Sequence, residues 1–123
     1  MNILDFANDE YINLITYRKD GTQVPTPVWL ASLDNSLVIT TSLNAGKVKR
    51  VRANGKASIY KTNQSGSKKL SEEIEVEASI IEDEHEKQLG IMAIRNKYLP
   101  ISKLFMKGPD KNRVIIKLEE RRG

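Results

Sequence analysis

The sequence predicts a mainly β fold, a small barrel of about six antiparallel strands with short helices. Two observations predict it: short alternations of apolar and polar residues recur along the 123-residue chain, and tight-turn signals separate them. A barrel closes the edges that such short strands would otherwise expose. Strands with one wet and one dry face favour antiparallel pairing over a parallel α/β sheet. We expect one domain, residues 1–123.

The first half of the chain is expected to form a turn or two of helix and then three strands in meander order. We place these elements at residues 2–8, 11–17, 23–33 and 37–41. Asp20-Gly21 marks the first hairpin, because glycine tolerates the positive φ that a tight turn demands. Asp34-Asn35 marks a second tight turn. Pro25 and Pro27 place the middle strand at an edge, a bulge or the barrel mouth, because proline cannot donate to a ladder.

The second half adds two helices and three strands. We expect a helix at 46–54, strands at 56–62 and 74–80, a helix at 83–98 and a strand at 113–119. Val48 and Val51 give the first helix its apolar face, and Asp83 with Glu86 forms a capping pair that opens the second. Gly90 costs the second helix roughly 1 kcal/mol relative to alanine, so packing must hold it. The stripe that we expect this helix to bury consists of Leu89, Met92, Ala93 and Asn96.

Composition excludes several kinds of chemistry. The chain has no cysteine, so disulfides, thiolate metal sites and thiol catalysis are excluded, and a reducing cytosol fits. His85 is the only histidine, which nearly rules out a multi-histidine metal centre or a serine triad; we expect it at the surface. No apolar run is long enough to span a membrane, and residues 1–10 lack a signal-peptide pattern. We expect a cytoplasmic protein with no metal and no membrane partner.

Charge is unevenly distributed along the chain, although the net charge is only +4. Residues 47–61 contain six basic residues and no acidic one, whereas residues 70–86 contain eight acidic residues and no lysine or arginine. The basic block favours an anion site. The alternative is that the two blocks lie near each other and their opposite charges offset one another. Nucleic-acid binding is a weaker alternative, because only 6% of the residues are aromatic and few could stack on bases. We expect no nucleic-acid partner.

The most informative part of the basic block is the start of the expected helix 46–54. Lys47 and Arg50 are three residues apart, so both can reach one anion from the same helix face. The preceding residues 40–46 offer hydroxyls and backbone N–H groups, and a helix N-terminus attracts phosphates. The residues alone therefore indicate an anion at the start of a basic helix, with an ordinary solvated helix as the alternative.

Four segments carry a resemblance to a known family: Tyr11–Gly21, Pro25–Trp29, Thr40–Ser42 and Gly46–Asn54. Together they resemble the short flavin-binding split-barrel proteins related to pyridoxamine 5'-phosphate oxidase (PPOX class). Within these, the sequence is most similar to the deazaflavin (coenzyme F-420)-dependent oxidoreductases. The resemblance implies a six-stranded split β-barrel of Greek-key type that dimerises, with two equivalent cofactors in clefts lined by both subunits.

The resemblance also implies the residues of the cofactor site. The implied phosphate ligands are Lys47 and Arg50, assisted by Thr40, Thr41 and Ser42. The backbone expected to run along the isoalloxazine ring is that of Pro27, Val28 and Trp29. Trp29 is equally well explained as a core or interface residue. The chain departs from the pattern at Gly55, where many relatives have proline. It is also shorter than the vitamin-processing oxidases, so we do not expect pyridoxamine phosphate as its substrate.

We therefore expect an oxidoreductase in which FMN or coenzyme F-420 supplies hydride chemistry for an unknown small substrate. FMN is favoured because it is universal, although Arg52 and Lys56 could serve the longer acidic tail of the deazaflavin. No acid–base residue stands out. The tyrosines expected to pack rather than to donate protons are Tyr11, Tyr17, Tyr60 and Tyr98. The alternative is a cofactor-binding protein without turnover, either a flavin carrier or a haem-binding relative.

Overall fold

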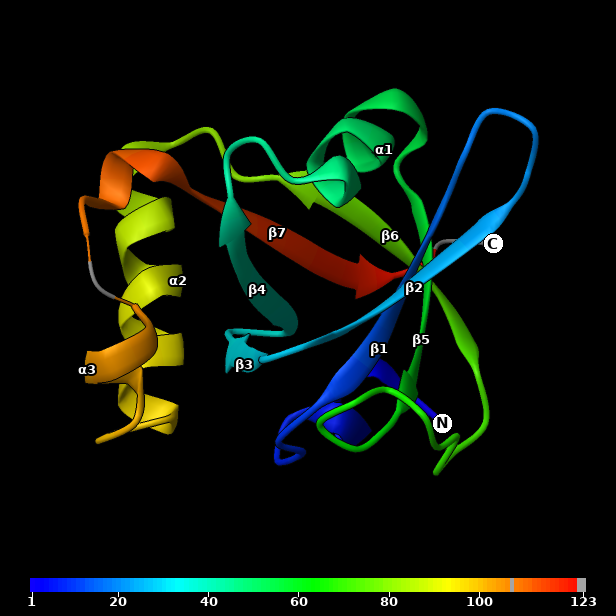
Figure 1. The fold of residues 1–123 in the computed structure, drawn as a ribbon, viewed down its shortest axis with the longest axis horizontal. Coiled ribbons are helices and arrows are strands. Elements are labelled where there is room, and N and C mark those ends of the chain that lie inside the picture. The colour runs from blue at the N-terminus through cyan, green and yellow to red at the C-terminus, as the bar shows by residue number, and fades with distance from the viewer. Residues whose placement is uncertain (107, 122–123) are drawn as a thin grey trace.

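The computed structural model describes residues 1–106 and 108–121, and its strands form one curled antiparallel sheet (Figure 1). The strands are β1 Ile12–Tyr17, β2 Gln23–Val28, β3 Ala31–Leu33, β4 Ser36–Ser42, β5 Lys56–Lys61, β6 Ile74–Ile80 and β7 Arg113–Glu120. The helices are α1 Gly46–Asn54, α2 Glu84–Lys97 and α3 Ser102–Phe105, with 3-10 turns η1 Ile3–Phe6 and η2 Asp110–Asn112. The prediction of a mainly β fold with short helices is confirmed.

The strand order β2-β1-β5-β6-β7-β4-β3 explains why the sheet curls into a barrel. The two edge strands, β2 and β3, are consecutive in the chain and are separated only by Trp29 and Leu30. Three residue steps span at most about 11 Å, so the two edges of the sheet must lie close together. Figure 1 shows this crossover, in light blue, passing from β2 into β3.

The structure has seven strands rather than the predicted six, because the run 23–33 divides. Up to Val28 it pairs with β1, and from Ala31 onward it pairs with β4. Pro25 and Pro27 lie on the edge strand β2, where proline costs no ladder hydrogen bond on the open side. The hairpin glycine, Gly21, has the expected positive φ of 88°.

Helix α1 has the predicted bounds and packs against β1 and β6, above the barrel in Figure 1. Its buried residues are Val48 and Val51, and it ends at Gly55, whose φ of 64° is the left-handed conformation that glycine favours. The start of this helix is therefore fixed next to the end of β4.

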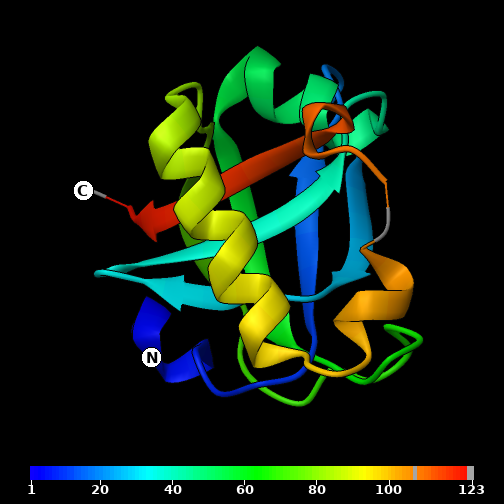
Figure 2. The same ribbon diagram turned by 90° about the vertical axis from the view of Figure 1, so that its left-hand side faces the viewer.

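Helix α2 lies across the face of the sheet formed by β3, β4 and β7 (Figure 2). The backbone N–H of Glu86 donates to the Asp83 carboxylate at 2.8 Å, as the capping pair predicted. The predicted buried stripe is wrong: Met92 is 54% exposed, Leu89 and Asn96 are also exposed, and Ala93 is only partly buried.

The face that α2 buries instead contains Gly90, Ile91 and Ile94. A Cβ on Gly90 would lie only 3.2 Å from Cγ2 of Ile115, so the glycine allows the helix to approach β7 closely. Apolar residues three positions apart occur on both faces of α2. The sequence pattern therefore does not tell which face is buried, and the contact with the sheet decides it. His85 is exposed at the start of the helix, as predicted.

Two apolar clusters occupy the two faces of the sheet. The larger lies inside the barrel and includes Phe6, Leu14 and Ile39; the smaller lies under α2 and includes Val38, Ile94 and Ile115. Among the residues that the structure describes, no helix is long and apolar enough to cross a membrane.

Candidate functional site

A cleft of about 760 Å³ opens where β2 and β4 end, between the start of α1 and the segment that contains α3 and η2. A volume of this size suits a small-molecule cofactor. The described residues that line it are Tyr11, Pro27, Val28, Trp29, Thr40, Thr41, Ser42, Lys47, Gln64, Phe105, Met106, Gly108, Pro109, Asn112 and Arg113. Seven of the eight residues that the sequence assigned to a cofactor site are among them; Arg50 is not.

Lys47 gives one end of the cleft its positive charge. Its side chain is half-buried, and burial, followed by the nearby Arg50 guanidinium, lowers its pKa from the ordinary 10.5. None of the ion pairs among residues 1–106 and 108–121 includes Lys47. A partly desolvated cation without a carboxylate partner is a favourable place for an anionic group of a ligand.

The end of β4 brings hydroxyl groups to the same end of the cleft. Thr40 Oγ1 is buried and has no hydrogen-bond partner among the described residues. In the β4–β7 register, Ser42 lies opposite Arg113, so the strand pairing brings a second cation to the cleft. Arg113 Nε lies 3.5 Å from the Asp110 carboxylate. The sequence analysis missed Arg113 because its place depends on a strand register that joins residues 71 positions apart.

Arg50 points towards β1 and does not line the cleft, although it lies only one turn of α1 away from Lys47. Its Nε donates to Thr16 Oγ1 on β1 at 2.6 Å. Its guanidinium also lies beside Gly46, where a Cβ would be 2.8 Å from Nη1. Burial, followed by the charge of Arg18, lowers the pKa of Arg50. Arg50 therefore links the start of α1 to the barrel and contributes charge next to the cleft without lining it.

Aromatic side chains form the other end of the cleft. The ring of Trp29 stacks on that of Tyr98, with centroids 4.2 Å apart and an interplanar angle of 7°. Phe105 meets Trp29 edge-on at 6.0 Å and is 71% exposed. Trp29 thus lines the cleft and also packs against the smaller apolar cluster; its contact with a cofactor stays a prediction.

The tyrosines behave largely as packing residues. Tyr17 shares a hydrogen bond of 2.8 Å with Ser58, and Tyr60 accepts one from Asn13 at 2.8 Å. Burial raises the pKa of Tyr98 to about 12, which keeps its hydroxyl protonated at physiological pH. Of the four tyrosines, Tyr11 is the one among the described residues that line the cleft. The described lining contains no aspartate, glutamate or histidine, so none of these lining residues offers a carboxyl or imidazole for acid–base work.

Comparison with known proteins identifies the fold. No family model and no curated protein matches the sequence. An inferred pyridoxamine 5'-phosphate oxidase from Listeria innocua is 23% identical, with a TM-score of 0.70 over 98% of this chain and 89% of the other. The chain has the pyridoxamine 5'-phosphate oxidase-like split-barrel fold.

Other split barrels with different ligands are similar to it as well. HutZ, a haem storage protein from Vibrio cholerae, is 15% identical, with a TM-score of 0.70 over 93% of this chain and 83% of its own. An F420 reductase is 19% identical, with a TM-score of 0.64 over 99% of this chain and 95% of its own. At these identities the likeness shows the fold, and the ligand of this split barrel has to be argued from its cleft.

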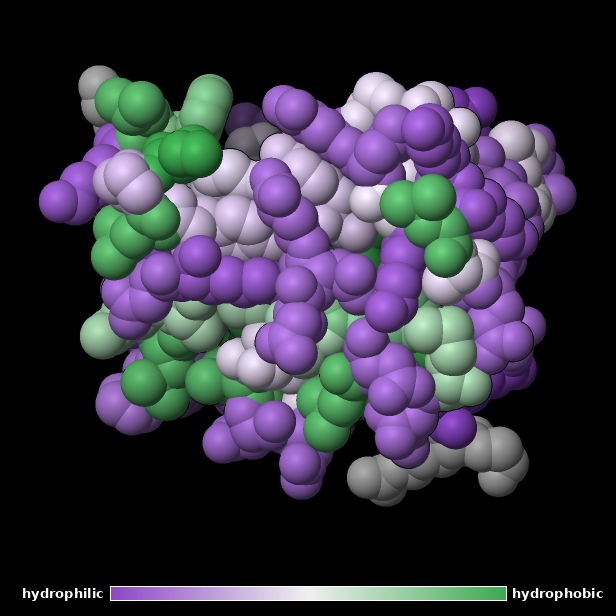
Figure 3. All heavy atoms as spheres, turned by 90° about the horizontal axis from the view of Figure 1, so that it is seen from below, coloured by the Kyte–Doolittle hydropathy of each residue, from purple (hydrophilic) through white to green (hydrophobic). Residues whose placement is uncertain are grey.

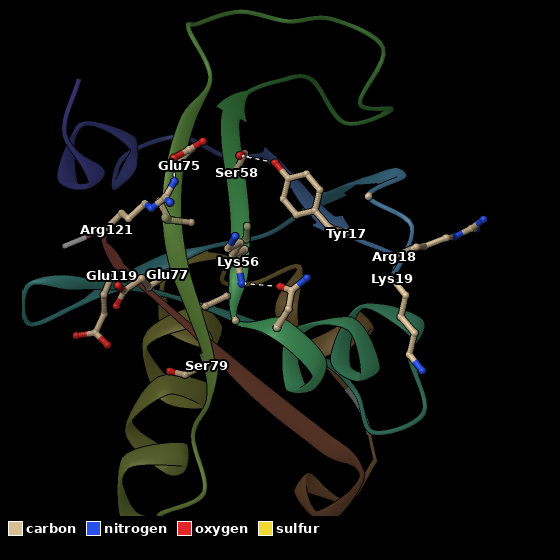
Figure 4. Close-up of a pocket in the computed structure, with 16 residues that line it drawn as sticks. Tyr17, Arg18, Lys19, Lys56, Ser58, Glu75, Glu77, Ser79, Glu119 and Arg121 are labelled. Atoms are coloured by element: carbon tan, nitrogen blue, oxygen red, sulfur yellow. Dashed lines mark hydrogen bonds and ion pairs between the residues drawn. The ribbon is translucent and has the colours of Figure 1, made fainter. Parts of the chain in front are cut away.

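The split barrel also has a larger groove, of about 880 Å³, over β5 and β6 (Figure 4). Its charged residues have both signs, and some are paired: Glu75 pairs with Arg121, and Lys56 lies opposite Glu77 across the β5–β6 ladder. None of the eight predicted site residues lines this groove. The cleft at Lys47 is therefore the better candidate for a cofactor.

Proposed function

We propose that the protein is an oxidoreductase that binds FMN or coenzyme F-420 in the cleft and transfers hydride to a small substrate, acting as a cytoplasmic homodimer. One observation carries the proposal: at one end of the cleft the half-buried Lys47 and the buried Thr40 hydroxyl have no ion-pair or hydrogen-bond partner among the described residues, and at the other end Trp29 forms a flat aromatic wall. A cofactor with a phosphate and a planar ring system needs both features in one cleft.

The phosphate would be held by Lys47 together with the hydroxyls of Thr40, Thr41 and Ser42. The first N–H groups of α1 have no intrahelical acceptor, so they add donors and a partial positive charge beside Lys47. Arg50, beside Gly46, raises the positive potential at the helix start, and Arg113 adds a second cation to the lining of the cleft. Charge-assisted hydrogen bonds of this kind are about twice as strong as neutral ones.

The ring system would lie along Pro27 and Val28 and against Trp29. When bound, a flavin or deazaflavin supplies the hydride chemistry. The residues of this chain bind the cofactor, orient it and exclude water from it. This division of work suits a cleft whose described lining has hydroxyls, amides and cations but no carboxyl or imidazole group.

FMN fits the charges around the cleft better than coenzyme F-420 does. The deazaflavin has a longer, acidic tail, for which Arg52 and Lys56 were candidate partners. Arg52 pairs with Glu82 at 3.9 Å, and Lys56 lines the groove of Figure 4 rather than the cleft. Arg113 is then the one additional cation among the described lining residues that could meet such a tail.

The homodimer is supported by exposed apolar side chains next to the cleft. Leu99, Ile101, Leu104 and Phe105 are each at least half exposed, and Figure 3 shows apolar side chains gathered at its left end, over α2 and α3. A second copy that covered this surface would also enclose the open side of the cleft. Light scattering at micromolar concentration is expected to give a dimer, and a monomer would contradict a shared cleft.

A haem-binding or carrier protein without turnover is the alternative. His85, the only histidine in the chain, is exposed on α2 and does not line the cleft. Among the described lining residues, the side chains that could hold a haem iron are those of Tyr11, Met106 and Lys47. The ligand set therefore favours a flavin.

The direct test is the visible absorption spectrum of the purified protein, titrated with FMN, coenzyme F-420 and haem in turn. We expect a flavin band shifted from that of free FMN, followed by reduction of some member of a panel of electron acceptors. A perturbed haem band would favour the alternative. Binding of none of the three would contradict the proposed function.

The affinity for FMN is expected to fall with rising pH through the titration of Lys47. Burial lowers the pKa of this lysine from the ordinary 10.5, so as pH rises it loses its charge, and its attraction for phosphate, earlier than an exposed lysine does. A bound phosphate favours the charged form, so affinity is highest below the pKa of the free protein and declines above it. Arginine stays protonated throughout this range. The ratio of wild-type to Lys47→Arg affinity, measured from pH 7 to pH 11, should therefore decrease towards the alkaline end; a ratio that stayed constant up to pH 11 would contradict a role of the Lys47 charge in binding the phosphate.

A further inference from the structure

The last turn of α2 holds two backbone segments together behind the cleft, residues 7–10 and the crossover at Leu30. The Lys97 ammonium group donates to the carbonyl oxygens of Ala7 at 3.0 Å, Asp9 at 2.6 Å and Leu30 at 2.8 Å. The neighbouring Tyr98 hydroxyl accepts from the backbone N–H of Leu30 at 3.0 Å. It also lies 2.7 Å from the carbonyl oxygen of Glu10, to which it can donate its proton.

Leu30 belongs to the crossover, where the sheet itself provides little support. The β1–β2 ladder ends at Val28 and the β3–β4 ladder begins at Ala31, so Trp29 and Leu30 lie outside both ladders. Buried backbone groups outside a ladder need other partners. Lys97 and Tyr98 supply these partners, for both the N–H and the carbonyl group of Leu30.

The same tyrosine fixes the orientation of the tryptophan side chain. The rings of Tyr98 and Trp29 are nearly parallel and in stacking contact, and the Lys97 ammonium lies 5.2 Å from the centre of the Tyr98 ring. Trp29 lines the cleft, whereas Tyr98 is not among its described lining residues. Tyr98 therefore lies behind Trp29, buried, with its own orientation fixed by hydrogen bonds at the hydroxyl end.

We propose that Lys97 and Tyr98 are positioning residues, which hold the crossover and the Trp29 ring in the orientation that receives the cofactor ring. The proposal rests on the proposed function for its last step, because it takes Trp29 as the wall against which the cofactor lies. Its first step, the orientation of Trp29, concerns the protein without any cofactor. A wall held in place before binding improves affinity because less freedom is lost when the ligand arrives.

The first measurement uses Trp29, the only tryptophan in the chain, as the probe. Tyr98→Phe keeps an aromatic ring for stacking and removes the hydrogen bonds to Leu30 and Glu10. In the cofactor-free protein we expect the Trp29 emission to shift to the red and acrylamide to quench it more strongly. Lys97→Met, which keeps the length of the side chain without its charge, should change the emission in the same direction. Tyr17→Phe is the matched control, because it removes a tyrosine hydroxyl whose hydrogen-bond partner in the described part of the chain is Ser58, in the groove of Figure 4.

The second measurement is the affinity for FMN and coenzyme F-420, by titration. Tyr98→Phe is expected to weaken binding of the preferred cofactor about tenfold, and Tyr17→Phe to leave it unchanged. A double-mutant cycle separates positioning from general stability. In a Trp29→Phe background the effect of Tyr98→Phe should shrink to about twofold, because the residue through which Tyr98 acts has been replaced.

Each outcome decides a different step. Unchanged emission in both Tyr98→Phe and Lys97→Met would overturn the proposal. So would changed emission with unchanged affinity, or additive losses in the cycle. If the wild-type protein binds neither cofactor, the proposed function is wrong and so is the last step, whereas the emission of the variants still decides whether Tyr98 and Lys97 orient Trp29.

Discussion

Lys47→Ala is expected to weaken FMN binding by about ten- to a hundredfold. Hydrogen bonds to charged groups contribute about 1.5–3 kcal/mol, and each 1.4 kcal/mol is a factor of ten in affinity. Lys47 lines the cleft and has no ion-pair partner in the described part of the chain, so its replacement removes ligand contacts without leaving an unpaired protein charge. Quenching of FMN fluorescence on binding, or calorimetry, measures the effect.

Two variants on the same helix make this result specific. Lys49→Ala removes an identical charge from the exposed side of α1, and it should change affinity by no more than about twofold because exposed charges are well screened. Arg50→Ala should weaken binding less than Lys47→Ala, since the Arg50 guanidinium is bound to Thr16 and lies outside the cleft lining. Equal losses of FMN affinity in Lys47→Ala and Lys49→Ala would show that the overall positive charge of the helix, and not a specific contact with Lys47, attracts the phosphate. A larger loss of FMN affinity in Arg50→Ala than in Lys47→Ala would indicate that the phosphate binds closer to β1.

The parts of the fold that could be predicted from the sequence are those set by neighbours in the chain. Helix α1 was correct to the residue, because Gly55 ends it and Val48 and Val51 fix its inner face. Strand β6 was also correct, because apolar and acidic residues alternate strictly along it. The same locality explains the anion end of the candidate site: Thr40, Thr41 and Ser42 precede Lys47 by only a few residues, so any fold with this strand and helix brings them together.

The parts that could not be predicted depend on contacts between distant segments. The run 23–33 divides into two strands because its first part pairs with β1 and its last part with β4. The sequence has no local signal for this change of partner. The buried face of α2 depends on how closely Gly90 approaches Ile115. Arg113 and Phe105 reach the cleft from the far end of the chain, through a strand register and an edge-on contact with Trp29.

Phe6→Ala is expected to lower the free energy of unfolding by about 3–5 kcal/mol, the usual loss for a buried phenylalanine. Phe6 is 0% exposed and packs from η1 into the larger apolar cluster inside the barrel. The whole domain is stable by only about 5–15 kcal/mol, so this single change removes a large share. Urea unfolding measures this loss, and the dependence of the free energy of unfolding on urea concentration (the m-value) should stay unchanged.

The chain contains only one other phenylalanine, which makes a matched comparison. Phe105 is 71% exposed and lies against Trp29 at the edge of the cleft, so Phe105→Ala should change the free energy of unfolding by less than about 1 kcal/mol. It should nevertheless weaken FMN binding severalfold, because it removes a side chain that lines the cleft and an edge contact, of about 0.5–1.5 kcal/mol, that helps to hold the Trp29 ring. The same substitution would then separate the two roles of aromatic residues in this barrel, with Phe6 stabilising the core and Phe105 forming part of the binding site. Equal destabilisation by both changes would place the α3 segment in the core and remove it from the cleft.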